Sequence, residues 1–458
     1  MGEQRRHGNK KLINEKRQRY RTMSVTSSHA RPPKAIEQGY VGNLTSDQVN
    51  KLRQAWKALL AFCGHDDTYL RANNLLSCFT CVLSDTEKYS RSKFREAWWN
   101  GTQSFHPDNL LLRYLRARKW DVEKSISMMV NAIKWRIDFD VEQVIRNGEY
   151  NISDYEMFSG KGYIYGFDKE GHVVCYVHAA LHITAKRDIE QSKKFTIWQM
   201  ETARVMAPAP YDKASIVFNM QGYTMANADT QFLRFFVTVL EAYYPESLHR
   251  VFVVSAPVVF NALWVLVSPW LDPVVRKKII FLKKPKQLLA YIDADQLVDK
   301  LGGSSGFKFH YTRGERNVDD ARLDDVDTRN KLMEEIWETR DLFEEATRTW
   351  ASMKECPERA ALAGKLMQQW IKLDPYVRAR SWYDRYGVVR EEDWAVNFKW
   401  LQLPKSNGIN PEESDDSSEY ESSASFESAE NIDDQMPDVF RSETMLDVKA
   451  SDDIDDLD

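Results

Sequence analysis

The stretch VFVVSAPVVFNALWVLVSPWL, residues 251–271, carries no charged side chain, although charged residues make up 29% of the 458-residue chain. It has the length of a membrane span, for which about 18 or more apolar residues are the usual signal. Pro257 and Pro269 interrupt it, however, and a proline lacks the backbone donor that a continuous helix needs. Two serines and one asparagine add polar groups. We therefore interpret the stretch as a strand, a proline turn and a short helix.

The two halves of this stretch predict different structures. Residues 251–254 are β-branched or aromatic, which favours a buried strand. Residues 258–267 fit one helix, about 15 Å long at 1.5 Å per residue. That helix is apolar on every side, and such a helix is either deeply buried or faces a lipid phase. The choice between these two surroundings decides the function.

The chain around this stretch alternates between short apolar runs and longer helical patterns. Strands are expected at residues 162–167, 172–178, 215–220 and 279–282, and helices at residues 188–206 and 227–243. Strands that alternate with helices of this length are typical of an α/β layer with a mainly parallel sheet. We therefore expect an α/β fold, in which residues 251–254 supply one of the strands.

Helical patterns flank this layer on both sides. Thr45 and Gln48 have the spacing of a capping box, and Asp121 is expected to cap a further helix. Residues 63–106 are mixed and are expected to form a partly ordered insertion, whereas residues 326–400 return to a helical pattern with six tryptophans. The parts expected are a disordered basic arm (1–43), a helical N-terminal unit (44–146), an α/β domain (147–312), a helical extension (313–405) and a disordered acidic tail (406–458).

The two ends of the chain carry opposite charges. Residues 1–34 hold ten Lys and Arg against two Glu, and residues 406–458 hold eighteen Asp and Glu against two basic residues. Segments with so little apolar content are not expected to fold. The basic arm has two interpretations, a contact with membrane or nucleic acid and a merely solubilising segment. The overall content of 43% hydrophobic and 12% aromatic residues indicates a folded body between the ends.

The cysteines and histidines argue against several classes of site. The chain has five cysteines, and its first residues lack the apolar segment of a secretory signal, so reduced thiols and a cytosolic location are expected. His178 and His182 have the spacing of helical metal ligands, but they fall in a predicted strand and its end, and no metal site is expected. A nucleophile elbow and a phosphate-binding glycine loop are absent from the sequence, so no enzyme activity is expected.

Several short motifs follow one another in a fixed order. They are LLLRYLRARKWD at residues 110–121, KWR at 134–136, YYPE at 243–246, AP at 256–257, WLDP at 270–273, KI at 278–279 and the stretch at 297–303. With these motifs the chain resembles the CRAL-TRIO family, which includes the fungal phosphatidylinositol transfer proteins, over residues 44–312. The resemblance implies the CRAL-TRIO fold, in which a helical N-terminal unit accompanies an α/β lipid pocket that is closed by a mobile gate helix.

The resemblance also implies which side chains contact the lipid headgroup. The family's inositol-phosphate contacts fall on Arg118, Lys119, Glu246 and Lys278. Arginine presents a planar fork of donors and lysine a point charge, and both suit a phosphate. The chain departs from the family at Val275, which replaces a threonine of the inositol site. Ala214 and Ile216 replace a Ser/Thr pair that serves phosphatidylcholine, which argues against phosphatidylcholine as the ligand.

A lipid carrier must shield acyl chains from water, because each exposed CH₂ group costs about 0.8 kcal/mol. A chain of more than about a dozen methylenes therefore costs on the order of 10 kcal/mol when it is wet. The lining and gate expected from the apolar stretch are Phe252, Val254, Phe260, Leu263, Trp264 and Leu266. An ordinary buried strand and helix would account for the same residues.

Two functions remain open from the sequence. The first is a non-catalytic lipid-transfer protein that binds phosphatidylinositol in a closed apolar cavity and exchanges it at membranes. The second is a regulatory scaffold or sensor whose cavity holds a neutral lipid, such as a sterol or a squalene-like molecule, and whose tails recruit partners. Both imply a cytoplasmic monomer that associates peripherally with endomembranes, without a cofactor beyond the lipid and without a nucleic acid partner.

Overall fold

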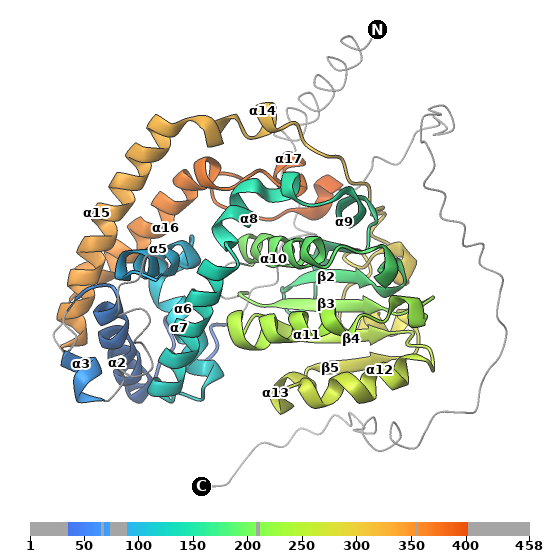
Figure 1. Cartoon of the computed structure of the whole chain (residues 1–458), viewed down its shortest axis with the longest axis horizontal. Helices are drawn as coiled ribbons and strands as arrows, with labels where there is room; N and C mark the ends of the chain where they lie inside the picture. The colour runs from blue at the N-terminus through green and yellow to red at the C-terminus, as the bar shows by residue number, and fades with distance from the viewer. Residues whose placement is uncertain (1–34, 66–67, 74–88, 208–210, 353–355, 402–458) are drawn as a thin grey trace. The chain divides into compact units, whose positions relative to one another are not determined.

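A five-stranded sheet with the strand order β1-β2-β3-β4-β5 forms the centre of the molecule (Figure 1). Its strands are β1 (Gly162–Phe167), β2 (Val173–His178), β3 (Ala214–Asn219), β4 (Leu248–Val254) and β5 (Ile279–Leu282). The first two strands are antiparallel, and β2 to β5 are parallel neighbours. The predicted α/β fold with a mainly parallel sheet is confirmed.

The computed structural model describes residues 35–401 except 66–67, 74–88, 208–210 and 353–355. The described residues belong to one compact unit. Most of the predicted basic arm, residues 1–34, and the whole of the predicted acidic tail, residues 406–458, lie outside the described residues.

Helices precede, interleave with and follow the strands. Before the sheet come α2 (Ser46–Phe62), α3 (Thr68–Ala72), α5 (Arg91–Thr102), α6 (Pro107–Ala117), α7 (Val122–Asp138), α8 (Val141–Asn147) and α9 (Asp154–Phe158). Between the strands lie α10 (Ile189–Val205), α11 (Thr230–Thr238) with a π-helical turn η6 (Val239–Tyr243), α12 (Phe260–Val267) and α13 (Pro273–Arg276). After the sheet come α14 (Arg316–Asp319), α15 (Val326–Ala351), α16 (Glu358–Val377) and α17 (Trp382–Arg385).

Two of the helix starts follow directly from the sequence. The hydroxyl of Thr45 accepts a hydrogen bond from the backbone of Gln48, whose side chain accepts one from the backbone of Thr45. The Asp121 carboxylate accepts a hydrogen bond from the backbone of Lys124 at the start of α7. Such bonds satisfy backbone donors that the first turn of a helix leaves without partners. Both predicted caps are confirmed.

The expected insertion at residues 63–106 is wrong over residues 91–102, which form α5. Phe94 and Trp98, four residues apart on one face of α5, are both buried, and Trp99 is buried beside them. Trp98 meets Trp56 of α2 edge to face, with ring centroids 6.2 Å apart. These large side chains make α5 part of the main core, because residues at i and i+4 share one face of a helix. The mixed composition of the surrounding residues concealed this face.

The sheet separates two clusters of buried apolar side chains. The larger cluster, called the main core here, joins one face of the sheet to the N-terminal helices and to α15, α16 and α17. The smaller cluster, called the gate cluster, lies between the other face and α11 and α12. Phe252 and Val254 of β4 belong to the main core, whereas Val251 and Val253 belong to the gate cluster. The alternation follows from the two-residue period of a strand.

The C-terminal helices pack onto the rest of the molecule. In Figure 1, α15 and α16 run side by side along one flank, and α15 also contacts α2. Tyr383 of α17 is buried, and its hydroxyl accepts a hydrogen bond of 2.7 Å from the backbone nitrogen of Ile164 in β1. Because β1 is an edge strand, this bond occupies a donor that the sheet itself does not use.

The charge-free stretch at residues 251–271 is divided between β4, α12 and a 3₁₀ turn at Ser268–Trp270. Within the described part of the chain, the helices are too short or too polar to cross a membrane. The predicted strand, proline turn and short helix are confirmed.

Candidate lipid-binding site

The gate cluster forms an apolar layer between the sheet and α12. Its buried members are Ile216, Met220, Tyr223, Leu248, Val251, Val253 and Phe260. Trp264 of α12 meets Phe281 of β5 edge to face with ring centroids 5.0 Å apart. Phe260, at the start of α12, meets Tyr223 at 6.1 Å. Aromatic side chains from one short helix therefore hold it against the sheet.

The structure brings only part of the predicted lining together. Phe260, Leu263 and Trp264 contribute to the gate cluster, as expected for one face of a helix. Phe252 and Val254 lie on the opposite face of the sheet, where the ring of Phe252 meets that of Tyr291 at 4.8 Å. The expectation that these two residues line the same layer as α12 is wrong, because alternate residues of a strand face opposite sides and these two share the side of the main core.

The outer surface of α12 and its surroundings is unusually apolar. Leu266, which was predicted to line the pocket, is 48% exposed and points away from the gate cluster. Val258, Val265 and Val274 are 69%, 71% and 52% exposed. These four residues are called the outer patch here. Two of them, Val265 and Leu266, lie on α12, which is therefore apolar both against the protein and toward solvent. A helix of this kind suits contact with a lipid phase.

Glu246 and Lys278 lie at the edge of the sheet where the parallel strands begin. Glu246 precedes β4 and Lys278 precedes β5, and neighbouring parallel strands start at the same edge. The Lys278 ammonium donates a hydrogen bond of 2.8 Å to the carbonyl oxygen of Leu248. Burial lowers the pKa of Lys278, while the nearby Glu246 carboxylate acts in the opposite direction. The structure therefore brings these two predicted headgroup residues within electrostatic reach of each other.

Arg118 and Lys119 lie at the end of α6 and are exposed. Lys119 and Trp120 have φ angles of 52° and 64°, a left-handed conformation that side chains other than glycine adopt rarely. The guanidinium of Arg118 acts on Glu241, whose pKa burial raises and Arg118 lowers in part. Glu241 in turn accepts a hydrogen bond of 2.8 Å from the backbone of Asp272. Arg118 thus lies within electrostatic reach of Glu241, which holds the start of α13.

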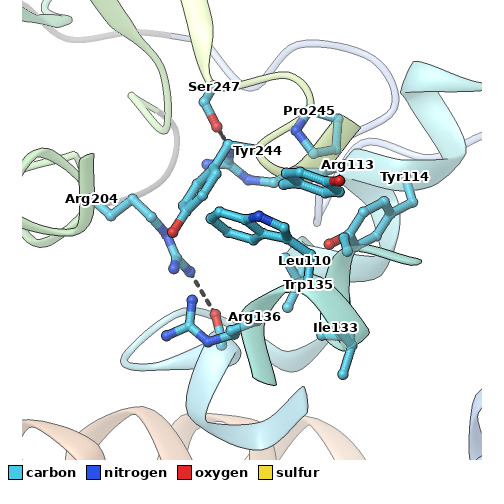
Figure 2. Close-up of a pocket in the computed structure, with 13 residues that line it drawn as sticks. Leu110, Arg113, Tyr114, Ile133, Trp135, Arg136, Arg204, Tyr244, Pro245 and Ser247 are labelled. Atoms are coloured by element: carbon cyan, nitrogen blue, oxygen red, sulfur yellow. Dashed lines mark hydrogen bonds between the residues drawn. The ribbon is translucent and has the colours of Figure 1, made fainter. Parts of the chain in front are cut away.

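A small cavity separates the N-terminal helices from the loop that carries Glu246 (Figure 2). Its volume of about 40 Å³ is close to that of a single water molecule. The indole of Trp135 lines it (Figure 2), stacked on Tyr243 with ring centroids 4.4 Å apart. A void of this size does not hold a lipid, so we interpret the cavity as a packing gap at the interface between the N-terminal helices and the loop that carries Glu246.

A buried ionic network holds the two sides of this interface together. Arg136 donates a hydrogen bond of 2.7 Å to Glu201, and the Tyr244 hydroxyl donates another of 2.7 Å to the same carboxylate. Burial alone would raise the pKa of Glu201, but Arg136 and Arg204 hold it at about 2. Arg113 donates to the Ser247 hydroxyl at 3.0 Å, next to Glu246. Trp135, Tyr244 and Arg136 stood inside recognised motifs, but sequence reasoning gave them no role.

A second polar cluster that sequence reasoning missed joins Asp168, His172 and His249, whose ligand-type atoms lie within 4.8 Å of one another. The two imidazoles are stacked, with centroids 3.8 Å apart and planes at 25°. Nearly parallel rings cannot both direct an in-plane lone pair at one ion. The Asp168 carboxylate accepts from the Ser215 hydroxyl at 2.8 Å and from the backbone of Glu170 and His172 at 2.9 Å each. This geometry favours a hydrogen-bonded turn over a metal centre.

The two histidines noted from the sequence lie apart in separate hydrogen-bonded groups. His178 contacts the Tyr163 hydroxyl at 3.0 Å and the Asn219 side chain at 3.1 Å. His182 contacts Asp229 at 3.1 Å. Their four-residue spacing therefore reflects two different environments at the end of β2.

Comparisons with known proteins agree with this architecture. The model of the CRAL/TRIO domain matches residues 157–303, and that of the CRAL/TRIO N-terminal domain matches residues 77–131. A CRAL-TRIO domain-containing protein of Schizosaccharomyces pombe is 34% identical over 305 residues, which cover 64% of this chain and 68% of that protein. The phosphatidylinositol transfer protein CSR1 of Eremothecium gossypii is 33% identical over 308 residues, covering 64% of this chain and 71% of that protein.

A third relative is more distant. The SEC14 cytosolic factor of Kluyveromyces lactis is 30% identical over 240 residues, which cover 48% of this chain and 79% of that protein. The CRAL/TRIO domain model, over residues 157–303, spans the sheet, α12 and the edge that carries Glu246 and Lys278. The fold, the motif order and these similarities agree, and the chain therefore belongs to the CRAL/TRIO domain family of lipid-binding and lipid-transfer proteins.

Proposed function

We propose that this protein is a non-catalytic carrier that binds phosphatidylinositol and exchanges it at membranes. The observation that carries the proposal is the position of Glu246 and Lys278 at the amino-terminal edge of the sheet whose face bears the gate cluster. A phospholipid has a charged headgroup joined to acyl chains, and this arrangement offers a complementary surface to each part.

The gate cluster supports the acyl-chain half of the proposal. Its side chains are almost entirely apolar, and they lie beneath α11 and the short helix α12. Displacing α12 outward would open a space that only an apolar ligand can fill, since about 0.8 kcal/mol per CH₂ group favours burial of the chains. The outer patch gives α12 a surface that is more favourably placed against a bilayer than in water. Membrane contact would therefore favour the open arrangement.

Lys278 and Glu246 support the headgroup half of the proposal. A lysine ammonium suits a phosphate, and a carboxylate accepts hydrogen bonds from inositol hydroxyls. The name of the Eremothecium gossypii relative also points to phosphatidylinositol as the ligand. Arg118 and Lys119 remain proposed contacts at the rim, where both are exposed.

Transfer of labelled phosphatidylinositol between vesicles tests this proposal. Lys278→Ala and Glu246→Ala should each lower the transfer rate at least about tenfold, because each removes one proposed headgroup contact and leaves its half-buried neighbour without a countercharge. Lys277→Ala removes an exposed neighbouring charge and serves as the matched control. Circular dichroism should show all three variants folded. Wild-type transfer by folded Lys278→Ala and Glu246→Ala would rule out the proposed headgroup site.

A second candidate is a sensor or scaffold that holds a neutral lipid. The specific observation in its favour is the Tyr223 hydroxyl, which is buried in the gate cluster and has no hydrogen-bond partner among the described residues. One polar atom in an apolar layer matches a ligand with a single hydroxyl, such as a sterol. Mass spectrometry of the lipid that co-purifies with the protein separates the two candidates, because only one predicts a phospholipid.

A further inference from the structure

Residues 35–44, called the N-terminal strap here, lie against the proposed headgroup site. The strap is a compact turn in which Gly39 donates to the carbonyl of Asn43 at 2.8 Å and the Asn43 side chain donates to the carbonyl of Ile36 at 2.8 Å. Tyr40 at its centre is buried. A segment with these internal bonds has a defined shape, so its contacts are specific.

One side of the strap is seated next to Arg118 and Lys119. The Arg116 guanidinium lies 3.8 Å from the centre of the Tyr40 ring and donates a hydrogen bond of 2.9 Å to the carbonyl of Gly39. Gly39 has a φ of 90°, and a Cβ there would come within 3.2 Å of the Trp120 ring. The strap therefore fits closely over the turn that contains the two exposed basic residues.

The other side of the strap reaches the edge with Glu246 and Lys278. Lys213 directly precedes β3, so it stands at the same edge of the sheet as Glu246 and Lys278. Its side chain is only 14% exposed, and its ammonium lies 3.4 Å from the Glu37 carboxylate and 5.4 Å from the centre of the Tyr40 ring. The strap thus contacts chain neighbours of Arg118 and Lys119 on one side, and Lys213 at the edge with Glu246 and Lys278 on the other.

The charges at this edge influence one another. Burial acts to lower the pKa of Lys213, but the Tyr40 hydroxyl, Glu37 and Glu246 outweigh it, and the net pKa is raised. Burial lowers the pKa of Lys278, Glu246 and Glu37 act to raise it, and Lys213 lowers it further. Two lysines that repel each other are therefore held near one edge by two carboxylates, and one of these carboxylates comes from the strap.

We propose that Lys213 is a further phosphate-binding residue of the headgroup site, and that the Glu37 carboxylate takes the place of the phosphate until a ligand displaces it. The inference rests on the proposed function and names an additional residue pair for the same site. A phosphodiester carries the charge of a carboxylate and offers comparable acceptor oxygens, so it can replace Glu37 beside Lys213 without leaving the ammonium unpaired.

The exposure of the two partners makes this exchange feasible. Glu37 is 47% exposed, whereas Lys213 is 14% exposed. Ion pairs with one partner in water contribute little to stability, so moving the carboxylate aside costs little. The less exposed lysine, in contrast, gains from any partner that is held in place. Glu37 of the strap consequently competes with the ligand phosphate for Lys213, so a ligand must bind Lys213 more tightly than Glu37 does before it is loaded.

Uptake of labelled phosphatidylinositol from phosphatidylcholine vesicles by the full-length protein tests the inference. We expect Lys213→Met to lower uptake roughly tenfold, the effect of losing one charge-assisted hydrogen bond. Lys213→Arg should retain most uptake, because it keeps the charge. Glu37→Gln should raise uptake about threefold, and it should have no effect when combined with Lys213→Met, since Glu37 acts through that lysine.

The matched control is Glu391→Gln. Glu391 pairs with Arg322 at the surface, and its side chain is 47% exposed, as is that of Glu37. Uptake by this variant should equal that of the wild type. Equal uptake by wild type, Lys213→Met and Glu37→Gln would overturn the inference and leave the proposed function standing.

A second titration, with inorganic phosphate followed by calorimetry, distinguishes a lipid phosphate from a free one. If the wild type takes up no phosphatidylinositol, the proposed function fails, and this titration then decides the inference by itself. Phosphate binding that strengthens in Glu37→Gln and disappears in Lys213→Met supports a phosphate site at Lys213. If the wild type takes up no phosphatidylinositol and phosphate binding does not distinguish these variants from the wild type, the inference is wrong.

Discussion

The two faces of the central sheet differ in how they are covered. Phe252 and Val254 face a continuous core in which long helices and buried ion pairs surround the sheet. Val251 and Val253, on the same strand, face a small cluster beneath the eight residues of α12, a helix whose first turn has no side-chain cap. A face covered by many elements is permanent, whereas the part of a face that one short helix covers can be uncovered without unfolding the rest.

Substitutions of two phenylalanines, one on each face of the sheet, should show the largest difference between the faces in the free energy of unfolding. Phe252→Ala removes a fully buried ring from the main core and should lower the free energy of unfolding by about 3–5 kcal/mol. Phe260→Ala removes a ring at the start of α12 and should cost less, about 2 kcal/mol, because the helix can settle into the space. Urea unfolding measures both values. Equal losses would show that α12 is as firmly anchored as the core.

The same pair should give the opposite order in lipid loading. Phe260→Ala changes the layer that we propose the acyl chains enter, so it should alter uptake from vesicles in the folded protein. Phe252→Ala should leave uptake per folded molecule unchanged, since its ring lies on the other face.

The buried network behind the Glu246 loop should give the molecule a marked acid sensitivity. The folded-state pKa of Glu201, about 2, is depressed below the unfolded value of about 4.3, so its stabilisation is present above the unfolded pKa and is lost as pH falls through the folded pKa. The contribution is at most about 3 kcal/mol. Glu201→Gln should therefore unfold more easily at neutral pH and show a flatter loss of stability between pH 5 and pH 2.

Unfolding curves measured over that pH range test the assignment. Glu190→Gln is a suitable control, because Glu190 lies on the same helix α10 but is 62% exposed beside Lys193. If Glu201→Gln and the control keep the pH profile of the wild type, the buried network contributes nothing to the stability of the main core.

The sequence predicted the fold well and the orientation of its strands less well. Helix caps at Thr45 and Asp121 and the period of the α/β region depend on near neighbours, which a sequence shows directly. Residues 251–254 of strand β4 are apolar on both faces because both are covered, so this run has no alternation that would assign Phe252 to one side. Only tertiary packing decides which face of the sheet each of these residues occupies.

The candidate site shows the same limit. Glu246 and Lys278 were accessible through motifs, whereas the pairing of Glu37 with Lys213 joins residues 176 positions apart in segments that no motif links. The helix α5 was missed for a related reason, since its buried Trp98 and Trp99 stand among charged and polar neighbours that weaken the apolar pattern.

Hydrogen exchange sharpens the contrast between the faces with a moderate expected effect. Backbone amides of α12 should exchange faster than those of β3, and the difference should increase when vesicles are added. The expectation follows from the short length of α12, its missing cap and the outer patch. If α12 remains as protected as β3 in the presence of vesicles, it is not a gate.

The smallest expected effect concerns how the face of the molecule that carries the outer patch binds a charged membrane. Residues 406–458 carry a net charge of −16, which should repel an anionic bilayer over about 8 Å at physiological salt. Deleting them should leave phosphatidylinositol loading unchanged, because the gate cluster and the proposed headgroup residues all lie before residue 283. Binding to phosphatidylserine vesicles at low salt should become tighter, and the difference should shrink as salt is added, since screening weakens the repulsion. Flotation of full-length and truncated protein over a salt series measures this. Equal binding at low salt would mean that contact between the outer patch and the membrane is governed by apolar burial alone.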